Sequence, residues 1–274
     1  MAVMAGAVTL FVALTLPLLS WWYWEYTKPD TYYGYALFVP VLAGVMLWHK
    51  RGDLRKTPIR VFNPALLLLI ASLTLFVVAS KTDMQAVMST TFLLSLIFSI
   101  WFVAGTAFVR AAGFPLLFLF LMAPLPGPLL NDATLGLQRL STSGAAVMLK
   151  LIGFAPQVQG NVLNLGNFVM EVDVPCSGFK LLLCLLTFGA AFAYLSDTTR
   201  VRQFALFAAV LPLSLALNAI RITLFGVVGE CLGASAAHAF HDWSGFIMLG
   251  LCMAALFGLA KGLGCKNFAG LPLF

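Results

Sequence analysis

Charged residues are scarce in this sequence, and their scarcity limits what the protein can be. Only 9% of the 274 residues are Asp, Glu, Lys or Arg, whereas 61% are hydrophobic. A water-soluble domain carries roughly a quarter charged residues, so water cannot solvate most of this surface. The mean hydropathy of +0.98 points the same way. The composition excludes a water-soluble globule and requires lipid as the main solvent.

Paired cysteine motifs, low-complexity linkers and internal repeats are also lacking. The five cysteines, at positions 176, 184, 231, 252 and 265, form no CxxC pair and no metal-ligand spacing. We expect Cys184 and Cys252 to pack inside spans and Cys265 to face the cytoplasm. Only Cys176 and Cys231 face the outer compartment, where a disulfide between them is chemically possible. Without a linker or repeat, residues 1–274 are predicted to form a single integral membrane domain.

Long apolar stretches are abundant instead. A spanning helix needs about 20 mostly apolar residues, and we predict eight, near residues 4–22, 32–48, 64–80, 86–109, 112–130, 176–195, 203–228 and 241–263. The first has neither a basic start nor a clear small-x-small cleavage site, so we interpret it as a helix rather than a signal peptide. The predicted fold is an all-α polytopic membrane protein with about eight transmembrane helices.

The net charge of +6 orients the chain and does not indicate a nucleic-acid partner. With eight spans, the four segments between or after spans that are rich in Lys and Arg fall on one side of the membrane, and the opposite side holds most of the acidic residues. Positively charged loops stay in the cytoplasm, so both termini of this multi-pass protein are predicted inside. The basic residues on that side are Lys50, Arg51, Arg55, Lys56, Arg60, Arg110, Arg200, Arg202, Lys261 and Lys266.

One long outer segment, residues 124–175, interrupts the spans. Its first part, Asn131 to Phe154, has the apolar spacing of an amphipathic helix lying on the outer leaflet. Its second part, Gln157 to Val174, alternates like strands around Gly166-Asn167, a two-residue pair suited to a hairpin turn. We therefore predict an outer amphipathic helix, and a small β-hairpin whose first strand runs from Val158 to Leu165. The apolar positions of the helix are Leu135, Leu140, Val147 and Leu151.

Cys176 follows a proline, in Val174-Pro175-Cys176-Ser177-Gly178. Proline favours the first turn of a helix, so Cys176 is predicted in the opening turn of the sixth span. Unpaired N–H groups and the helix dipole there stabilise a thiolate, the nucleophilic form. Gly178 would leave room for a substrate backbone, and Lys180 would add positive charge. The alternative is that Cys176 is only a small packing residue.

Arg221 lies deep in an otherwise apolar span, close to its predicted outer end. An intramembrane arginine is costly and usually marks a functional site. Asn218, three residues earlier, shares its helical face and is expected to hold the guanidinium in place. The alternative is an arginine that snorkels to the outer headgroups.

His241 opens the eighth predicted span, in His241-Asp242-Trp243-Ser244-Gly245. Asp242 or Ser244 is expected to cap that helix. His238 is a competing histidine one turn earlier. The two histidines could instead bind zinc, but no third ligand is evident, so no metal or cofactor is predicted.

Topology brings these three spans to one membrane face. Cys176, Arg221 and His241 would each present one reactive side chain at a similar depth on the non-cytoplasmic side. Nucleophile, base and oxyanion stabiliser are the roles that acyl transfer requires. The pattern therefore favours acyl-transfer chemistry at the outer face.

At these residues the chain resembles the exosortase/archaeosortase family of membrane transpeptidases. The matching pieces are Cys176-Ser177-Gly178, Asn218-Ala219-Ile220-Arg221-Ile222 and His241-Asp242-Trp243-Ser244-Gly245, and the stretch from Pro124 to Val172 looks like the family's outer segment. The resemblance implies a cysteine peptidase or transpeptidase whose catalytic residues are Cys176, Arg221 and His241. Its supporting residues would be Ser177, Gly178, Lys180, Asn218 and Asp242.

The resemblance also implies the partners. The substrates would be exported proteins with a C-terminal sorting tail (PEP-CTERM proteins): a short motif such as Pro-Glu-Pro, a hydrophobic span and a basic end. The processed protein would pass to a surface acceptor, a lipid or a polysaccharide. A small-solute transporter, or a non-enzymatic subunit of a polysaccharide export system, is the alternative. A transporter should place its polar residues near the bilayer midplane, often in repeated halves, which this sequence does not show.

Overall fold

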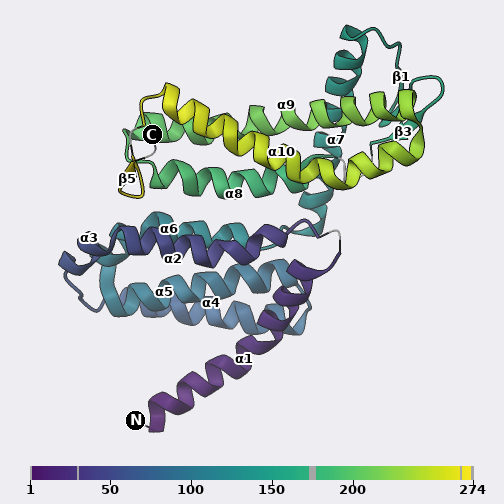
Figure 1. Ribbon diagram of the computed structural model, residues 1–274. Coiled ribbons are helices and arrows are strands. Elements are labelled where there is room, and N and C mark those ends of the chain that lie inside the picture. Colours follow the sequence, from purple (N-terminus) through teal and green to yellow (C-terminus); the bar gives the residue numbers. More distant parts are fainter. Residues whose placement is uncertain (1, 30, 173–176, 266, 273–274) are drawn as a thin grey trace. The chain divides into compact units, whose positions relative to one another are not determined.

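The computed structural model describes residues 2–29, 31–172, 177–265 and 267–272. Most of these residues are helical (Figure 1), and the chain divides into two compact units, Met1–Pro126 and Gly127–Phe274. The helices include several that are long and apolar enough to cross a membrane. The predicted fold class, a mostly helical polytopic membrane protein, is confirmed.

Four helical segments of the described residues meet the length and composition of a span. They are α4 (Pro64–Lys81), α5 (Gln85–Ala111), α9 (Arg200–Leu232) and Trp243–Gly262 of α10 (Ala234–Gly262). A fifth arises if α6 (Gly113–Phe118) and η2 (Leu119–Met122) count with α7 (Gly127–Leu151) as one broken span. Two apolar helices are shorter, Gly34–His49 and α8 (Phe179–Leu195). That each predicted segment crosses the bilayer stays a prediction.

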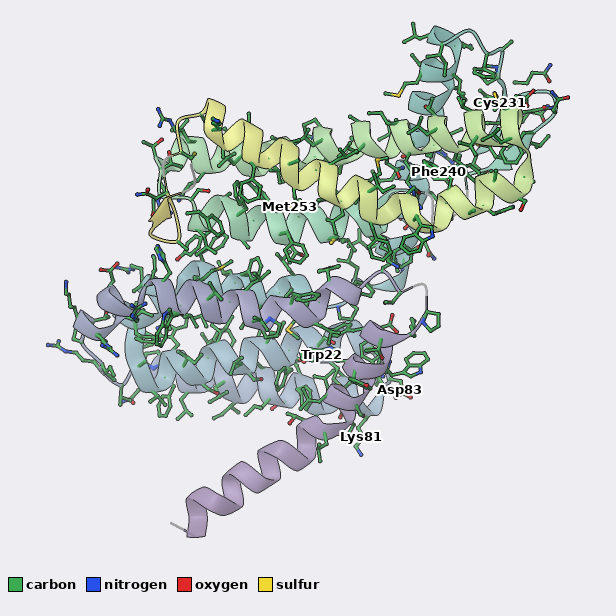
Figure 2. The ribbon with its side chains drawn as sticks, in the orientation of Figure 1. Trp22, Lys81, Asp83, Cys231, Phe240 and Met253 are labelled. Carbon is green, nitrogen blue, oxygen red and sulfur yellow. The ribbon has the colours of Figure 1, made fainter. Side chains whose placement is uncertain are left out.

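The first unit joins its helices through buried hydroxyl groups. It contains α1 (Ala2–Thr27), η1 (Gly34–Phe38), α2 (Val39–His49), α3 (Arg51–Lys56), α4, α5, α6 and η2. Ser95 Oγ of α5 donates to Ser72 Oγ of α4 at 3.0 Å. Trp22 Nε1 of α1 (Figure 2) donates to Ser89 Oγ of α5 at 2.9 Å. Such bonds satisfy polar groups between apolar helices, which lipid cannot do.

The fifth predicted span ends earlier than the sequence suggested, at Met122 rather than near residue 130. Proline cannot continue a helix, and Pro124 and Pro126 follow directly. Tyrosine hydroxyl groups hold the unwound stretch: Tyr26 donates to Met122 O at 2.6 Å, Tyr35 donates to Leu121 O at 3.0 Å, and Tyr33 accepts from Leu125 N at 3.0 Å. The break is therefore stabilised by specific bonds.

The second unit is built around α9, which contacts α7, α8 and α10. It also contains the strands β1 (Gln157–Gln159), β2 (Val162–Asn164), β3 (Val169–Glu171), β4 (Asn267–Phe268) and β5 (Leu271–Pro272). Large apolar side chains fill the space between α8, α9 and α10. This core includes Leu185, Phe192, Leu206, Val210, Cys252 and Leu256.

The predicted amphipathic helix is present as α7, with its apolar face turned outward. The four apolar positions named above, among them Leu140 and Leu151, are exposed. The face packed against α9 is small or polar, as at Gln138, Ser141 and Ala145. In a membrane protein small and polar groups serve helix contacts while apolar groups can face lipid. The arrangement of α7 fits lipid as the solvent of its outer face.

The predicted hairpin is confirmed, and one further strand extends it. Leu165 N donates to Phe168 O at 3.0 Å across the two-residue turn Gly166-Asn167. The single strand expected from Val158 to Leu165 is wrong, because a second two-residue turn begins at Gly160 (φ +64°), where glycine favours the left-handed region. The result is a three-stranded antiparallel sheet in the order β1-β2-β3.

Two glycines of α9 let this sheet pack directly on the helix. Met170 and Leu165 lie over Gly226, and the Phe168 ring lies over Gly229. A methyl group at either glycine would collide with those side chains. Apolar residues of the sheet, α7, α9 and α10 form one buried core, which includes Leu149, Leu163, Phe168 and Met170.

Candidate functional site

A small open pocket lies between β3, α9 and α10 in the second unit. Two of the three predicted catalytic residues, Arg221 and His241, belong to its wall. Glu171 adds a carboxylate, and the remaining lining is apolar. The complete lining is Met170, Glu171, Val172, Arg221, Ile222, Phe225 and His241.

The Arg221 guanidinium is fixed by α10. Arg221 Nε donates to Ser244 Oγ at 2.7 Å, and one terminal nitrogen donates to the His241 carbonyl oxygen at 3.4 Å. Ser244 is fully buried, and its hydroxyl donates in turn to the same carbonyl at 2.9 Å. A serine between an arginine and a carbonyl restricts the rotamers of the arginine. The positive charge is therefore held at the wall of the pocket.

His241 lies inside α10 rather than at its start. The helix begins at Ala234, after Gly233 (φ +87°), because the alanine-rich stretch before His241 is strongly helix-forming. The predicted capping by Asp242 or Ser244 is therefore wrong. Ser244 instead accepts from Arg221, and the Asp242 side chain lies outside the part of the chain that the structure describes.

The two histidines share one aromatic neighbour. The Phe225 ring lies 5.6 Å from the His241 ring and 6.2 Å from the His238 ring, edge to face in both cases. His238 is exposed, whereas His241 is half-buried and lines the pocket. Among the described residues, no group of three His, Cys, Asp or Glu side chains is arranged to hold a metal ion.

The predicted nucleophile, Cys176, lies outside the described residues, as does Pro175. The helix expected to open there begins later: α8 starts at Phe179, after Gly178 in the left-handed region (φ +83°). A residue with that φ is not α-helical, so α8 begins after Gly178, and the predicted place of Cys176 in an opening helical turn lies outside the described residues. Ser177 is buried, and its Oγ accepts from Phe179 N at 3.3 Å.

Asn218 fills the space that was predicted for a substrate at Gly178. A methyl group at Gly178 would lie 2.7 Å from Asn218 Cγ, so the close approach is intramolecular. Asn218 Nδ2 donates to Ser141 Oγ at 2.8 Å, and Ser141 Oγ donates to Ser177 O at 3.1 Å. These bonds tie α9 and α7 to the chain just before α8. Asn218 thus supports the segment next to Cys176.

Lys180 stands apart from the pocket. It is exposed in the first turn of α8 and is not part of the pocket lining. Cys231, labelled in Figure 2, is a free, exposed cysteine near the end of α9. Its proposed pairing with Cys176 falls on a residue outside the described part of the chain.

Two residues that hold the pocket wall were missed from the sequence. Glu230 accepts from Asn167 N at 3.1 Å, from Asn167 Nδ2 at 2.9 Å and from Phe168 N at 2.8 Å. Gln138 Nε2 of α7 donates to Val172 O at the end of β3. Glu230 is an isolated acid among apolar neighbours in the sequence, and that contrast is the signal that could have marked it.

Comparison with known protein families identifies one match. Residues 21–258 match the family model described as transmembrane exosortase, of the EpsH type. No curated protein and no solved structure gives a significant match. The matched region covers most of both units and every residue of the pocket wall. The chain belongs to the transmembrane exosortase family.

Proposed function

We propose that this exosortase is a membrane-embedded cysteine transpeptidase that cleaves the C-terminal sorting signal of exported proteins and transfers them to a surface acceptor. Exosortases are membrane transpeptidases for PEP-CTERM proteins. The observation that carries the proposal is the fixed Arg221 guanidinium beside His241 at one pocket. The wall of that pocket, β3, ends five residues before Cys176 in the chain.

In the proposed reaction, the Cys176 thiolate attacks the carbonyl carbon of the scissile peptide bond. Arg221 stabilises the oxyanion, a role that suits a group that is always charged. His241 gives its proton to the leaving amine as the C–N bond breaks, which leaves a thioester on Cys176. An acceptor amine or water then attacks the thioester and frees the thiolate, while His241 takes up a proton.

Ser244 and Asn218 support this chemistry without touching the reacting atoms. Ser244 positions the guanidinium, so that less side-chain entropy is lost when the oxyanion forms. Asn218 positions the chain before α8 through Ser141. Both residues are nearly inaccessible to solvent, which keeps their bonds strong in a low-dielectric surrounding.

The family suggests the bacterial inner membrane as the location, and the charge bias of the loops supports cytoplasmic termini and a pocket on the periplasmic side. A phosphatase reporter that is active only outside the cytoplasm should be active when inserted between residues 131 and 156. The same reporter should be inactive between residues 51 and 60. The reverse pattern would place His241 in the cytoplasm and contradict the proposed site.

The proposed activity is tested by co-expression with a protein that carries a Pro-Glu-Pro motif, a hydrophobic span and a basic end. Wild-type enzyme should shorten this reporter, and Cys176→Ala should leave it at full length. Cys231→Ala is the matched control, because Cys231 is also predicted on the outer side but takes no part in the mechanism. Equal processing by wild type and Cys176→Ala would reject the proposal.

A further inference from the structure

The outer edge of β3 is open. The sheet order is β1-β2-β3, so β3 has a neighbouring strand on one side only. Leu165 N donates to Phe168 O, and Val172 N donates to Asn161 O at 2.8 Å. Backbone groups alternate along an antiparallel strand, so the N–H and C=O groups of Val169 and Glu171 point away from β2. No hydrogen bond within the described residues uses these outward groups.

This open edge borders the pocket. Met170 and Val172 are buried toward the helices, whereas Val169 is 59% exposed and Glu171 is exposed. Met170, Glu171 and Val172 line the pocket together with Arg221 and His241. An extended chain beside β3 would therefore run past the groups to which the proposed mechanism assigns the chemistry.

We propose that the substrate's sorting motif binds as a fourth strand along the open edge of β3. This inference rests on the proposed function and names the binding mode of the same site. Strand addition gives affinity through main-chain hydrogen bonds and specificity through pockets for alternate side chains. Both parts are present: outward N–H and C=O groups at Val169 and Glu171, and the pocket beside them.

The occupant is a peptide, because only a peptide backbone presents donors and acceptors at the two-residue period of β3. A Pro-X-Pro segment suits this edge. A residue before proline is restricted to extended conformations, so the motif loses little entropy on binding. Its central residue would present both N–H and C=O to β3. The backbone nitrogens of the two prolines, which carry no N–H group, would face away from β3.

Proline substitutions at two matched valines test the proposal. Val169→Pro removes one outward N–H of β3, and proline is tolerated on an edge strand when that N–H makes no ladder bond. Val158 is the control: it is also an exposed valine on an edge strand, and its backbone groups also point outward, but on β1 at the far side of the sheet. Processing of the tail-bearing reporter should fall about tenfold with Val169→Pro, the upper range for a lost hydrogen bond. Val158→Pro should stay within about twofold of wild type.

Equal rates for Val169→Pro and wild type would overturn the proposal, and so would an equal loss in both variants. A second measurement leaves the protein backbone unchanged. Purified Cys176→Ala enzyme is titrated with short fluorescent Pro-Glu-Pro peptides, each N-methylated at one non-proline amide. Affinity should fall at alternate residues along the peptide. Uniform sensitivity or none would reject strand addition.

The binding experiment also separates the two proposals, since it requires no turnover. If wild-type enzyme processes the reporter but peptide affinity does not alternate with the methylated position, the proposed function stands and the proposed strand addition is rejected. If peptide affinity alternates but the wild-type enzyme does not process the reporter, strand addition is supported and the proposed transpeptidase function is rejected.

Discussion

Near each end of α9 a carboxylate side chain binds the turn of a small β-sheet, but the two surroundings differ. At one end, Glu230 accepts the N–H groups of the β2-β3 turn. At the other end, Asp197 Oδ2 accepts Gly270 N, at 3.0 Å, from the turn between β4 and β5. In both places a carboxylate holds a short β-hairpin against the helices (Figure 1). A two-stranded element such as β4-β5 is marginal alone in water, so it depends on such support.

What differs is the interior beside each hairpin. Near β4 and β5 the helices meet through apolar side chains such as Leu206, Leu256 and Ala260. Near β1 to β3 they enclose buried polar groups, Asn218 and Ser244, and the half-buried Arg221. A carboxylate that holds a hairpin is therefore not evidence of a functional site. The fixed cation beside an open pocket distinguishes the end near Glu230.

The largest difference in processing rate is expected between substitutions of the two histidines near Glu230. His241→Ala should lower processing by about 10³-fold, within the range for loss of an acid–base group, because His241 lines the pocket. His238→Ala should retain most activity, since His238 is exposed and outside the pocket lining. Initial rates with the tail-bearing reporter measure both. Loss only with His238→Ala would move the proton-transfer role by one turn of α10.

A slightly smaller effect should distinguish Arg221, in the C-terminal half of α9, from Arg202, in its first turn. Arg221→Lys keeps the charge but loses the planar group that reaches Ser244 and the His241 carbonyl together. Processing should fall about 10²-fold, as for loss of an oxyanion donor. Arg202→Lys, near the β4-β5 end, should stay close to wild type in the same assay. Comparable activity of both variants would reject the oxyanion-stabilising role of Arg221.

The smallest effect should compare the two carboxylates. Glu230→Gln weakens the charge-assisted bonds to Asn167 and Phe168 and loosens the sheet that forms the pocket wall. Processing should fall about 3- to 10-fold, with a lower melting temperature. Asp197→Asn should lower the melting temperature similarly but leave processing within about twofold. Equal losses of activity would make the two ends equivalent.

Sequence patterns predicted the local features well. Hydropathy identified the helices, and the Gly166-Asn167 pair predicted a two-residue turn that the register confirms. Arg221 and His241 were expected together, and they line one pocket. These predictions depend on side-chain chemistry and periodicity, which are properties of short segments.

The errors concern contacts between distant segments. The start of α8 depends on Asn218, which fills the space over Gly178, 40 residues away in sequence. The third strand depends on a turn at Gly160 that an apolar run conceals. The role of Glu230 requires a partner 63 residues away. Periodicity carries no information about such partners.

The central claim is that Cys176 carries the acyl group. The most direct measurement adds hydroxylamine to membranes that contain the enzyme and the tail-bearing reporter, because hydroxylamine intercepts thioesters. Mass spectrometry should find a C-terminal hydroxamate on the shortened reporter with wild-type enzyme. Cys176→Ser, present at normal levels, should give none and should process more slowly by several orders of magnitude. Processing by Cys176→Ser at close to the wild-type rate would contradict the account and exclude Cys176 as the nucleophile.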